Sequence, residues 1–123
     1  KTIGVLGLAF KQNTDDMRDA PSLDIILALQ AAGAKIRAYD PEAMDEAAHL
    51  LSDIEFAKSA YDAVQDADAM VIITEWDQFR ALDFERIKEA LSTNIVVDLR
   101  NIYSPDDMAA RGFKYTSIGR PSI

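Results

Sequence analysis

The segment that decides the fold is Ile3-Gly4-Val5-Leu6-Gly7-Leu8, a short and nearly continuous apolar run. Such a run is typical of a strand that is covered on both faces, as the strands of a parallel sheet are. A polar loop follows, and apolar residues then recur at helical spacing over residues 23–32. Ser22 or Asp19 is the expected start of this helix, and Gly33 stands where a left-handed cap belongs. The first unit is therefore predicted as strand, loop and helix.

The same alternation continues along the chain. Further strands are predicted at residues 35–39, 54–57, 69–73, 95–97 and 113–118. The helices between them are expected to begin at the N-caps Asp40, Ser59, Asp83 and Ser104. Regular alternation favours parallel pairing with right-handed crossovers. We therefore predict an α/β fold with a doubly wound, mainly parallel (Rossmann-like) sheet and helices on both faces.

Composition limits the classes of function. The 123 residues are 49% hydrophobic and 28% charged, which is typical of one globular domain, so residues 1–123 are predicted as a single domain. The net charge of −8 disfavours nucleic acid and anionic membranes as partners. The sequence contains no cysteine, which excludes a disulfide or a thiol nucleophile, and no membrane span is expected. An apolar strand that starts at the third residue suggests a piece of a longer protein.

Ligands of doubly wound sheets bind outside the carboxyl ends of the strands, which directs attention to the loops there. The loop over residues 9–21 is long and carries Lys11 and Arg18 beside Asp15 and Asp16. These cations either bind an anionic ligand or pair with the carboxylates in a solvated loop. Arg100 follows the fifth strand, and two interpretations stay open for it: a fork for a phosphate or carboxylate, or a surface arginine paired with Asp98.

For several other residues, a structural role is favoured over a role in ligand binding. Asp40 is either the ribose-binding acid of a dinucleotide site or a helix N-cap, and the cap is favoured. Gly4 and Gly7 have the spacing G-x-x-G, which indicates close packing rather than a phosphate-binding loop. Trp76 is expected to pack in the core or at its rim, and His49 is expected to be a surface or half-buried residue without a metal or catalytic role.

Six motifs in order resemble one known family. They are Gly7-Leu8-Ala9-Phe10-Lys11, Thr14-Asp15-Asp16-Met17-Arg18-Asp19-Ala20-Pro21-Ser22, Ala38-Tyr39-Asp40-Pro41, Thr74-Glu75-Trp76, Asp98-Leu99-Arg100-Asn101 and Ser117-Ile118-Gly119-Arg120. They are similar to the C-terminal, UDP-sugar-binding domain of the UDP-glucose/GDP-mannose dehydrogenases, most of all to its bacterial UDP-glucose branch. The resemblance implies a parent enzyme that oxidises the sugar C6 hydroxyl in two NAD-dependent steps through a cysteine-bound thiohemiacetal.

The resemblance also implies roles for individual residues. Phe10 and Lys11 match a pair that lines the UDP-sugar site, Arg100 matches a substrate-contacting arginine, and Arg18 matches an arginine that reaches NAD. NAD would be bound mainly by an N-terminal domain outside this chain, and the catalytic cysteine would lie between the two domains. This chain would then hold no catalytic residue and no metal, and it would be inactive alone. The parent is expected to be a cytoplasmic homo-oligomer.

Other functions remain as alternatives. The domain could belong to a GDP-mannose or UDP-N-acetylmannosamine dehydrogenase, because these relatives share much of the pattern. A receiver-like regulatory module of the same α/β class is disfavoured, because Ala9-Phe10-Lys11 and Ala57-Lys58 stand where that chemistry needs carboxylates. A complete small NAD-binding protein is disfavoured by the glycine spacing.

Overall fold

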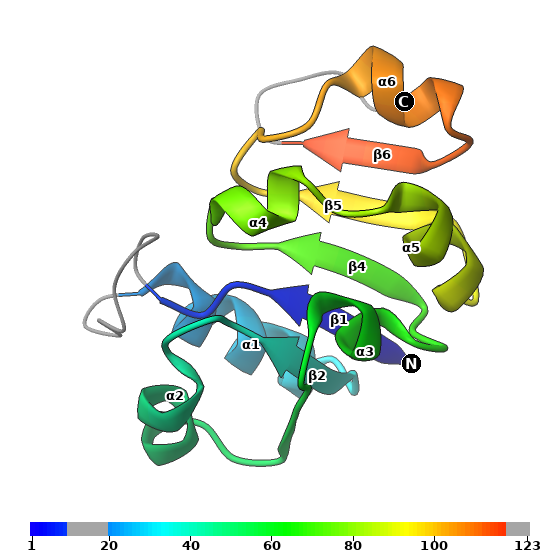
Figure 1. Cartoon of the computed structure of the whole chain (residues 1–123). Coiled ribbons are helices and arrows are strands. Elements are labelled where there is room, and N and C mark those ends of the chain that lie inside the picture. The colour runs from blue at the N-terminus through cyan, green and yellow to red at the C-terminus, as the bar shows by residue number, and fades with distance from the viewer. Residues whose placement is uncertain (10–19, 118–123) are drawn as a thin grey trace.

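The structure, a computed structural model, describes residues 1–9 and 20–117 (Figure 1). Within them the strands are Thr2–Leu6 (β1), Lys35–Tyr39 (β2), Ile54–Phe56 (β3), Ala69–Ile72 (β4), Ile95–Asp98 (β5) and Lys114–Ser117 (β6). The helices are Pro21–Ala31 (α1), Met44–Leu50 (α2), Ala60–Val64 (α3), Asp77–Arg80 (α4), Phe84–Ala90 (α5) and Pro105–Ala110 (α6).

The six strands form one sheet in the order β3-β2-β1-β4-β5-β6, and every neighbouring pair is parallel. Leu6 aligns with Ile72, and Ile72 aligns with Asp98, so the strands end together at one edge. We call this the carboxyl edge, and the opposite one the amino edge. The chain order reverses between β1 and β4, which makes their junction the switch point where such folds bind ligands. Receiver domains have the order 2-1-3-4-5, so the observed order excludes that alternative.

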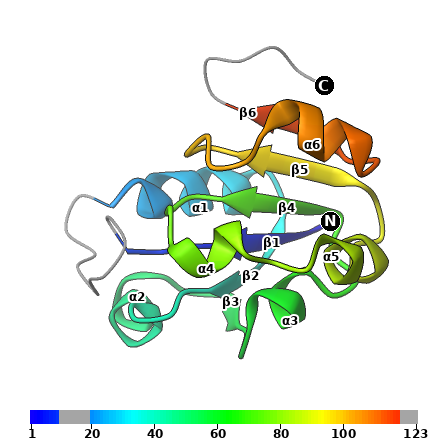
Figure 2. The same cartoon turned by 45° about the horizontal axis from the view of Figure 1, so that its top comes forward.

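Helices cover both faces of the sheet, as predicted. On one face, α1 and α2 pack with Ile26 and Ala47 against strand residues that include Val5 and Val71. On the other face, α3 to α6 pack against strand residues that include Leu6 and Ile72. Figures 1 and 2 show α3 and α5 on the side of the sheet opposite α1. The predicted doubly wound α/β fold is confirmed.

Most of the predicted N-caps are confirmed. The side chains of Ser59, Asp83 and Ser104 accept hydrogen bonds from the backbone N–H groups of the helices that follow them. The start of α1 was predicted wrongly at Ser22, because the helix begins at Pro21 after an Ala20 cap. The Ser22 hydroxyl instead donates to the Leu8 carbonyl at 2.6 Å. The other expected cap, Asp19, lies outside the described residues.

Two glycines allow close approaches, as the packing interpretation predicts. A Cβ atom on Gly4 would lie 2.7 Å from the carbonyl oxygen of Ala63 in α3. Gly7 has a φ of +99°, and a Cβ there would lie 2.5 Å from the backbone nitrogen of Thr74. Glycine is therefore required where β1 meets α3 and where the segment after β1 meets the one after β4.

Candidate functional site

The carboxyl edge gathers the segments that follow β1, β2, β4 and β5. Asp40 links three of them, because its fully buried carboxylate accepts hydrogen bonds from five donors. Oδ2 accepts from the backbone N–H groups of Leu8 and Ala9 at 2.7 and 3.0 Å, and from the Trp76 indole at 3.1 Å. Oδ1 accepts from the N–H groups of Glu42 and Ala43, both at 2.8 Å.

These contacts decide between the two interpretations of Asp40. The prediction that Asp40 is the N-cap of the second helix is wrong, because α2 begins at Met44 with Ala43 as its N-cap, and the bonds to Glu42 and Ala43 close the turn before that helix. Both carboxylate oxygens are occupied inside the protein, so the side chain does not reach outward as a ribose-binding acid would. Trp76 is 7% exposed and packs at the core rim, which confirms the predicted packing role.

The backbone carbonyl groups of Leu8 and Ala9, which follow β1, also accept hydrogen bonds from buried side chains. The Thr74 hydroxyl donates to the Ala9 carbonyl at 2.7 Å, and the Ser22 hydroxyl donates to the Leu8 carbonyl. Thr74 and Ser22 are both buried. The backbone of Leu8 and Ala9 is therefore fixed on both its donor and its acceptor sides, directly before Phe10 in the sequence.

A second buried aspartate organises the segment after β5. Asp98 Oδ1 accepts from the Arg100 backbone N–H at 3.0 Å. Asp98 Oδ2 accepts from the N–H groups of Ile102 and Tyr103, and from the Tyr115 hydroxyl at 2.6 Å. Asn101 adopts a left-handed conformation with a φ of +56°, which turns the chain sharply. Asp98 thus fixes the backbone that carries Arg100.

Tyr103 completes the support of this segment. Its hydroxyl donates to the Phe79 carbonyl at 2.6 Å, and its ring packs edge-on against Phe84 with centroids 5.0 Å apart. Burial raises the pKa of Tyr103 well above its ordinary value near 10, and the nearby Asp98 carboxylate adds to the shift. The phenol therefore stays a neutral hydrogen-bond donor across the physiological range.

Arg100 lies at the carboxyl edge, as predicted, but its charge partner differs from the one expected. Its Nε lies 2.5 Å from Oε2 of Glu75, which follows β4. Among the described residues, Asp98 bonds to the backbone N–H of Arg100 and not to its side chain. The predicted surface pair with Asp98 is therefore wrong, because Asp98 is buried and accepts from the turn after β5. The Arg100 side chain remains 38% exposed at the switch-point side of the sheet.

Three of the predicted site residues, Phe10, Lys11 and Arg18, lie outside the described residues, as do Asp15 and Asp16. Glu75 is the residue that the sequence analysis missed. His49 is exposed, as expected. Within residues 1–9 and 20–117, no group of three potential ligand side chains could hold a metal ion.

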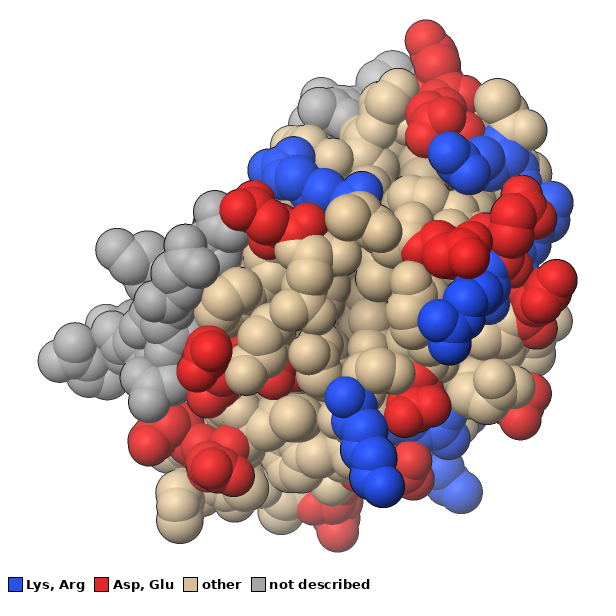
Figure 3. Space-filling view, viewed as in Figure 1, with Lys and Arg blue, Asp and Glu red and all other residues tan. Residues whose placement is uncertain are grey.

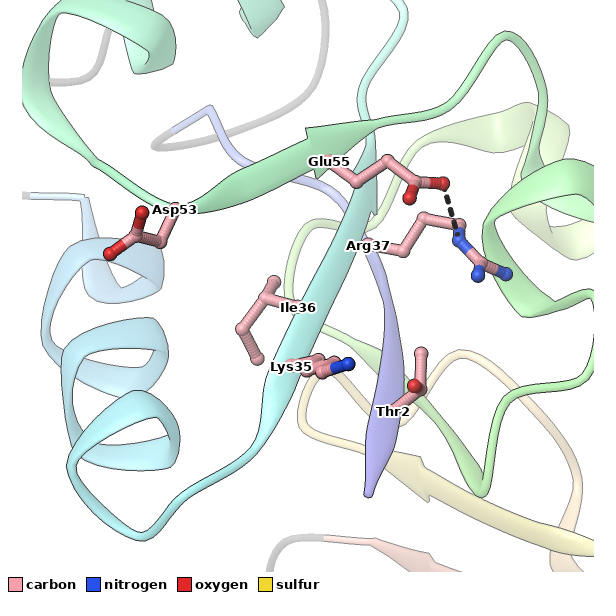
Figure 4. A pocket seen from close by; sticks show the side chains of 6 residues that line it. All are labelled: Thr2, Lys35, Ile36, Arg37, Asp53 and Glu55. Atoms are coloured by element: carbon pink, nitrogen blue, oxygen red, sulfur yellow. Dashed lines mark ion pairs between the residues drawn. The ribbon is translucent and has the colours of Figure 1, made fainter.

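The amino edge carries a hollow of about 360 Å³ lined by Thr2, Lys35, Ile36, Arg37, Asp53 and Glu55 (Figure 4). Arg37 Nε lies 2.7 Å from Glu55 Oε2 there. This pair resembles the Glu75 and Arg100 pair in chemistry but joins the middle of β2 to the middle of β3, the outermost strand on the side of the sheet away from β5. On the face drawn in Figure 3, Lys and Arg side chains are interspersed with Asp and Glu. No helix in the described part of the chain is long and apolar enough to cross a membrane.

The strand order defines a Rossmann-like domain, a class of fold that binds its ligands at the switch point of the sheet. The chain belongs to the UDP-glucose/GDP-mannose dehydrogenase family, and residues 4–105 match the UDP binding domain of that family. A UDP-glucose 6-dehydrogenase of Rhizobium meliloti (strain 1021) is 56% identical over 119 residues, which are 97% of this chain and 27% of the relative. The chain thus spans about a quarter of the length of the curated relatives it matches.

Solved structures agree with this assignment. A UDP-glucose dehydrogenase of Pyrobaculum islandicum has a TM-score of 0.77 at 31% identity, over 94% of this chain and 24% of its own. A UDP-D-ManNAc dehydrogenase of Pyrococcus horikoshii has a TM-score of 0.77 at 32% identity, over 97% of this chain and 25% of its own. The predicted family and fold are confirmed.

Proposed function

We propose that this chain is the C-terminal, UDP-sugar-binding domain of an NAD-dependent UDP-glucose 6-dehydrogenase that converts UDP-glucose to UDP-glucuronate. The observation that carries the proposal is the 56% identity to an enzyme of that name over 97% of this chain. The geometry supports it, because a partly exposed arginine lies at the ligand-binding edge of the sheet. The parent is proposed to be cytoplasmic, because UDP-glucose and NAD are cytoplasmic metabolites, and to be a homo-oligomer.

In this proposal the chain's own residues bind and orient the substrate. Phe10, Lys11 and Arg100 hold the UDP-sugar, and Arg18 reaches toward NAD. An arginine fork suits a diphosphate because its planar donors match phosphate oxygens in pairs. The chain contributes no catalytic residue, and the cysteine that holds the intermediate is proposed to lie in the preceding part of the parent.

NAD, which accepts hydride from the substrate, is proposed to be held mainly by the preceding domain. The described residues support that division. Asp40 stands where a dinucleotide fold places its ribose-binding acid, and both its oxygens are engaged inside the protein. Gly7 is packed against Thr74 rather than open to a pyrophosphate. The contribution of this chain to NAD is thus limited to Arg18 in our proposal.

A test separates the two ligands by residue in the complete dehydrogenase. Lys11→Ala and Arg100→Ala should each weaken UDP-glucose binding by about ten- to a hundredfold, because each removes a charge-assisted hydrogen bond. Arg18→Ala should weaken NAD binding by a similar factor. Lys35→Ala is the matched control, because this exposed lysine lies at the amino edge. Calorimetry should measure each ligand separately, because KM mixes binding with chemistry.

The outcomes are distinct. If Arg18→Ala weakens UDP-glucose binding and leaves NAD binding intact, the roles assigned to the first loop are reversed. If all three variants bind both ligands as the Lys35→Ala control does, the residue roles carried over from the family are wrong.

A second candidate concerns the sugar nucleotide. The UDP-D-ManNAc dehydrogenase of Pyrococcus horikoshii is as similar in fold to this chain as the UDP-glucose dehydrogenase of Pyrobaculum islandicum is. A thermal-shift series with UDP-glucose, UDP-N-acetylmannosamine and GDP-mannose distinguishes these substrates, because stabilisation grows with ligand concentration relative to Kd. We expect the largest shift with UDP-glucose.

A further inference from the structure

Arg100 is held at two points, its backbone N–H group and its guanidinium. Its backbone N–H donates to Asp98, which fixes where the side chain starts. Its guanidinium is paired with Glu75, which reaches across from the end of the neighbouring strand. The strand register explains the meeting, because Ile72 and Asp98 are aligned and the two residues follow them by three and two positions.

The position of the Glu75 carboxylate favours an ion pair with the Arg100 guanidinium. Its side chain is 21% exposed, and Oε2 is shielded from water. The pairing with Arg100 is an ion pair by distance, and its angles are not those of a hydrogen bond. A shielded carboxylate oxygen needs a compensating positive charge, and the arginine supplies it.

Glu75 approaches the guanidinium at Nε. Within residues 1–9 and 20–117, neither terminal nitrogen of Arg100 donates a hydrogen bond. The terminal nitrogens are the donors that can bind two oxygens of one phosphate. An arginine already held at Nε loses less side-chain freedom when it binds a ligand.

From these contacts we infer that Glu75 is a positioning residue, which holds the Arg100 guanidinium at the carboxyl edge so that its terminal nitrogens bind the diphosphate of the sugar nucleotide. The inference rests on the proposed function, because it takes Arg100 as a ligand-binding residue. Glu75 itself does not contact the ligand in this account. Its negative charge acts through the arginine.

The sign of the effect distinguishes positioning from competition. A carboxylate that merely competed with the ligand for Arg100 would, when removed, leave the arginine free and strengthen binding. A positioning carboxylate would, when removed, weaken binding, because the ligand must then order a mobile side chain. We expect Glu75→Ala to weaken UDP-glucose binding by about three- to tenfold. Glu75→Gln should lie between Glu75→Ala and the unchanged protein, because its amide keeps the size of the side chain and a partly negative oxygen but loses the full charge.

The test is a double-mutant cycle in the complete dehydrogenase, with UDP-glucose binding measured by calorimetry. Glu75→Ala should have no further effect once Arg100→Ala is present, because its action passes through the arginine. A structural role would instead produce the same loss in both backgrounds. Thermal unfolding of each variant without ligand checks that the variant is folded. If Glu75→Ala does not fold, the near-isosteric Glu75→Gln replaces it in the cycle.

The matched control is Glu55→Ala in β3, the outermost strand on the side of the sheet away from β5. Glu55 is also a glutamate paired with an arginine Nε across neighbouring strands, so its removal reproduces the chemical change away from the ligand (Figure 4). UDP-glucose binding should be unchanged in that variant.

Each result has one meaning. Weaker binding by Glu75→Ala that vanishes in the Arg100→Ala background supports the inference. If Glu75→Ala binds UDP-glucose normally or more tightly, or if its loss adds to that of Arg100→Ala, the inference about Glu75 is wrong. Arg100 remains a binding residue in that case, provided that Arg100→Ala itself binds UDP-glucose weakly. Normal binding by Arg100→Ala overturns the assigned role of Arg100 and this inference together.

Discussion

At the scale of single residues, Gly7 shows how tightly the switch point is packed. It combines a positive φ with a close approach to Thr74, so a side chain there meets both backbone strain and a steric clash. Gly33 has a similar φ of +94°, but apart from its chain neighbours no residue has a heavy atom within 4 Å of the position where its Cβ would be. Substituting Gly33 therefore tests backbone strain alone, whereas substituting Gly7 tests backbone strain together with a steric clash.

We predict that Gly7→Ala lowers the free energy of unfolding by about 2 to 4 kcal/mol, whereas Gly33→Ala lowers it by about 1 kcal/mol. The difference is the cost of the clash with Thr74. Urea unfolding of this chain, followed by circular dichroism, measures both values. Equal losses in the two variants would show that Thr74 moves aside and that the switch point is loosely packed.

The residue scale also shows what the sequence could predict at the site. Arg100 was placed at the carboxyl edge because it follows a predicted strand in a parallel sheet. Its partner Glu75 was missed because the two residues are far apart in sequence and meet only through the pairing of β4 with β5. Asp98 was the expected partner by proximity in the sequence, yet its buried carboxylate is used by the turn that follows.

At the scale of elements, β1, β4 and β5 were predictable because each is mainly a short apolar run between polar segments. The helix α4 was not predicted, because four residues are too few for a helical period to show. The late start of α2 was also missed, because Asp40 makes its capping bonds to a turn that precedes the helix. Local patterns thus predicted which elements exist, while tertiary contacts decided where some of them begin.

Asp40 joins the ends of three strands, and its loss should show how strongly these elements depend on one another. Asp40→Asn places an amide NH₂ among donors, because every partner of the carboxylate donates. We predict a loss of about 2 to 4 kcal/mol in the free energy of unfolding.

Asp83→Asn is the matched control, because Asp83 is an exposed N-cap that accepts from two backbone N–H groups. Asparagine caps helices about as well as aspartate, so we expect a change of about 0.5 kcal/mol or less. Chemical unfolding of both variants measures the comparison. A loss at Asp40 no larger than the one at Asp83 would contradict the role of Asp40 as the junction of three strands.

At the scale of the whole molecule, the chain is about a quarter of the length of its curated relatives, and our account divides their chemistry accordingly. We predict that this chain alone does not reduce NAD in the presence of UDP-glucose, because it contains no cysteine to hold the intermediate. Absorbance of reduced nicotinamide measures this, with the complete dehydrogenase as the positive control. A steady rise proportional to the amount of this chain would contradict the proposed division.

The most direct test of the central claim, that the carboxyl edge binds the sugar nucleotide, is a titration of this ¹⁵N-labelled chain with UDP-glucose by NMR. A ligand of a crevice between domains loses contacts when one half is absent, so we expect a Kd that is micromolar or weaker, on the order accessible to this method. The account predicts that amide signals of Glu75, Arg100 and Asn101 shift with ligand concentration, whereas those of Lys35 and Asp53 at the amino edge stay in place. Shifts centred on the amino edge, or none at millimolar UDP-glucose, would contradict it.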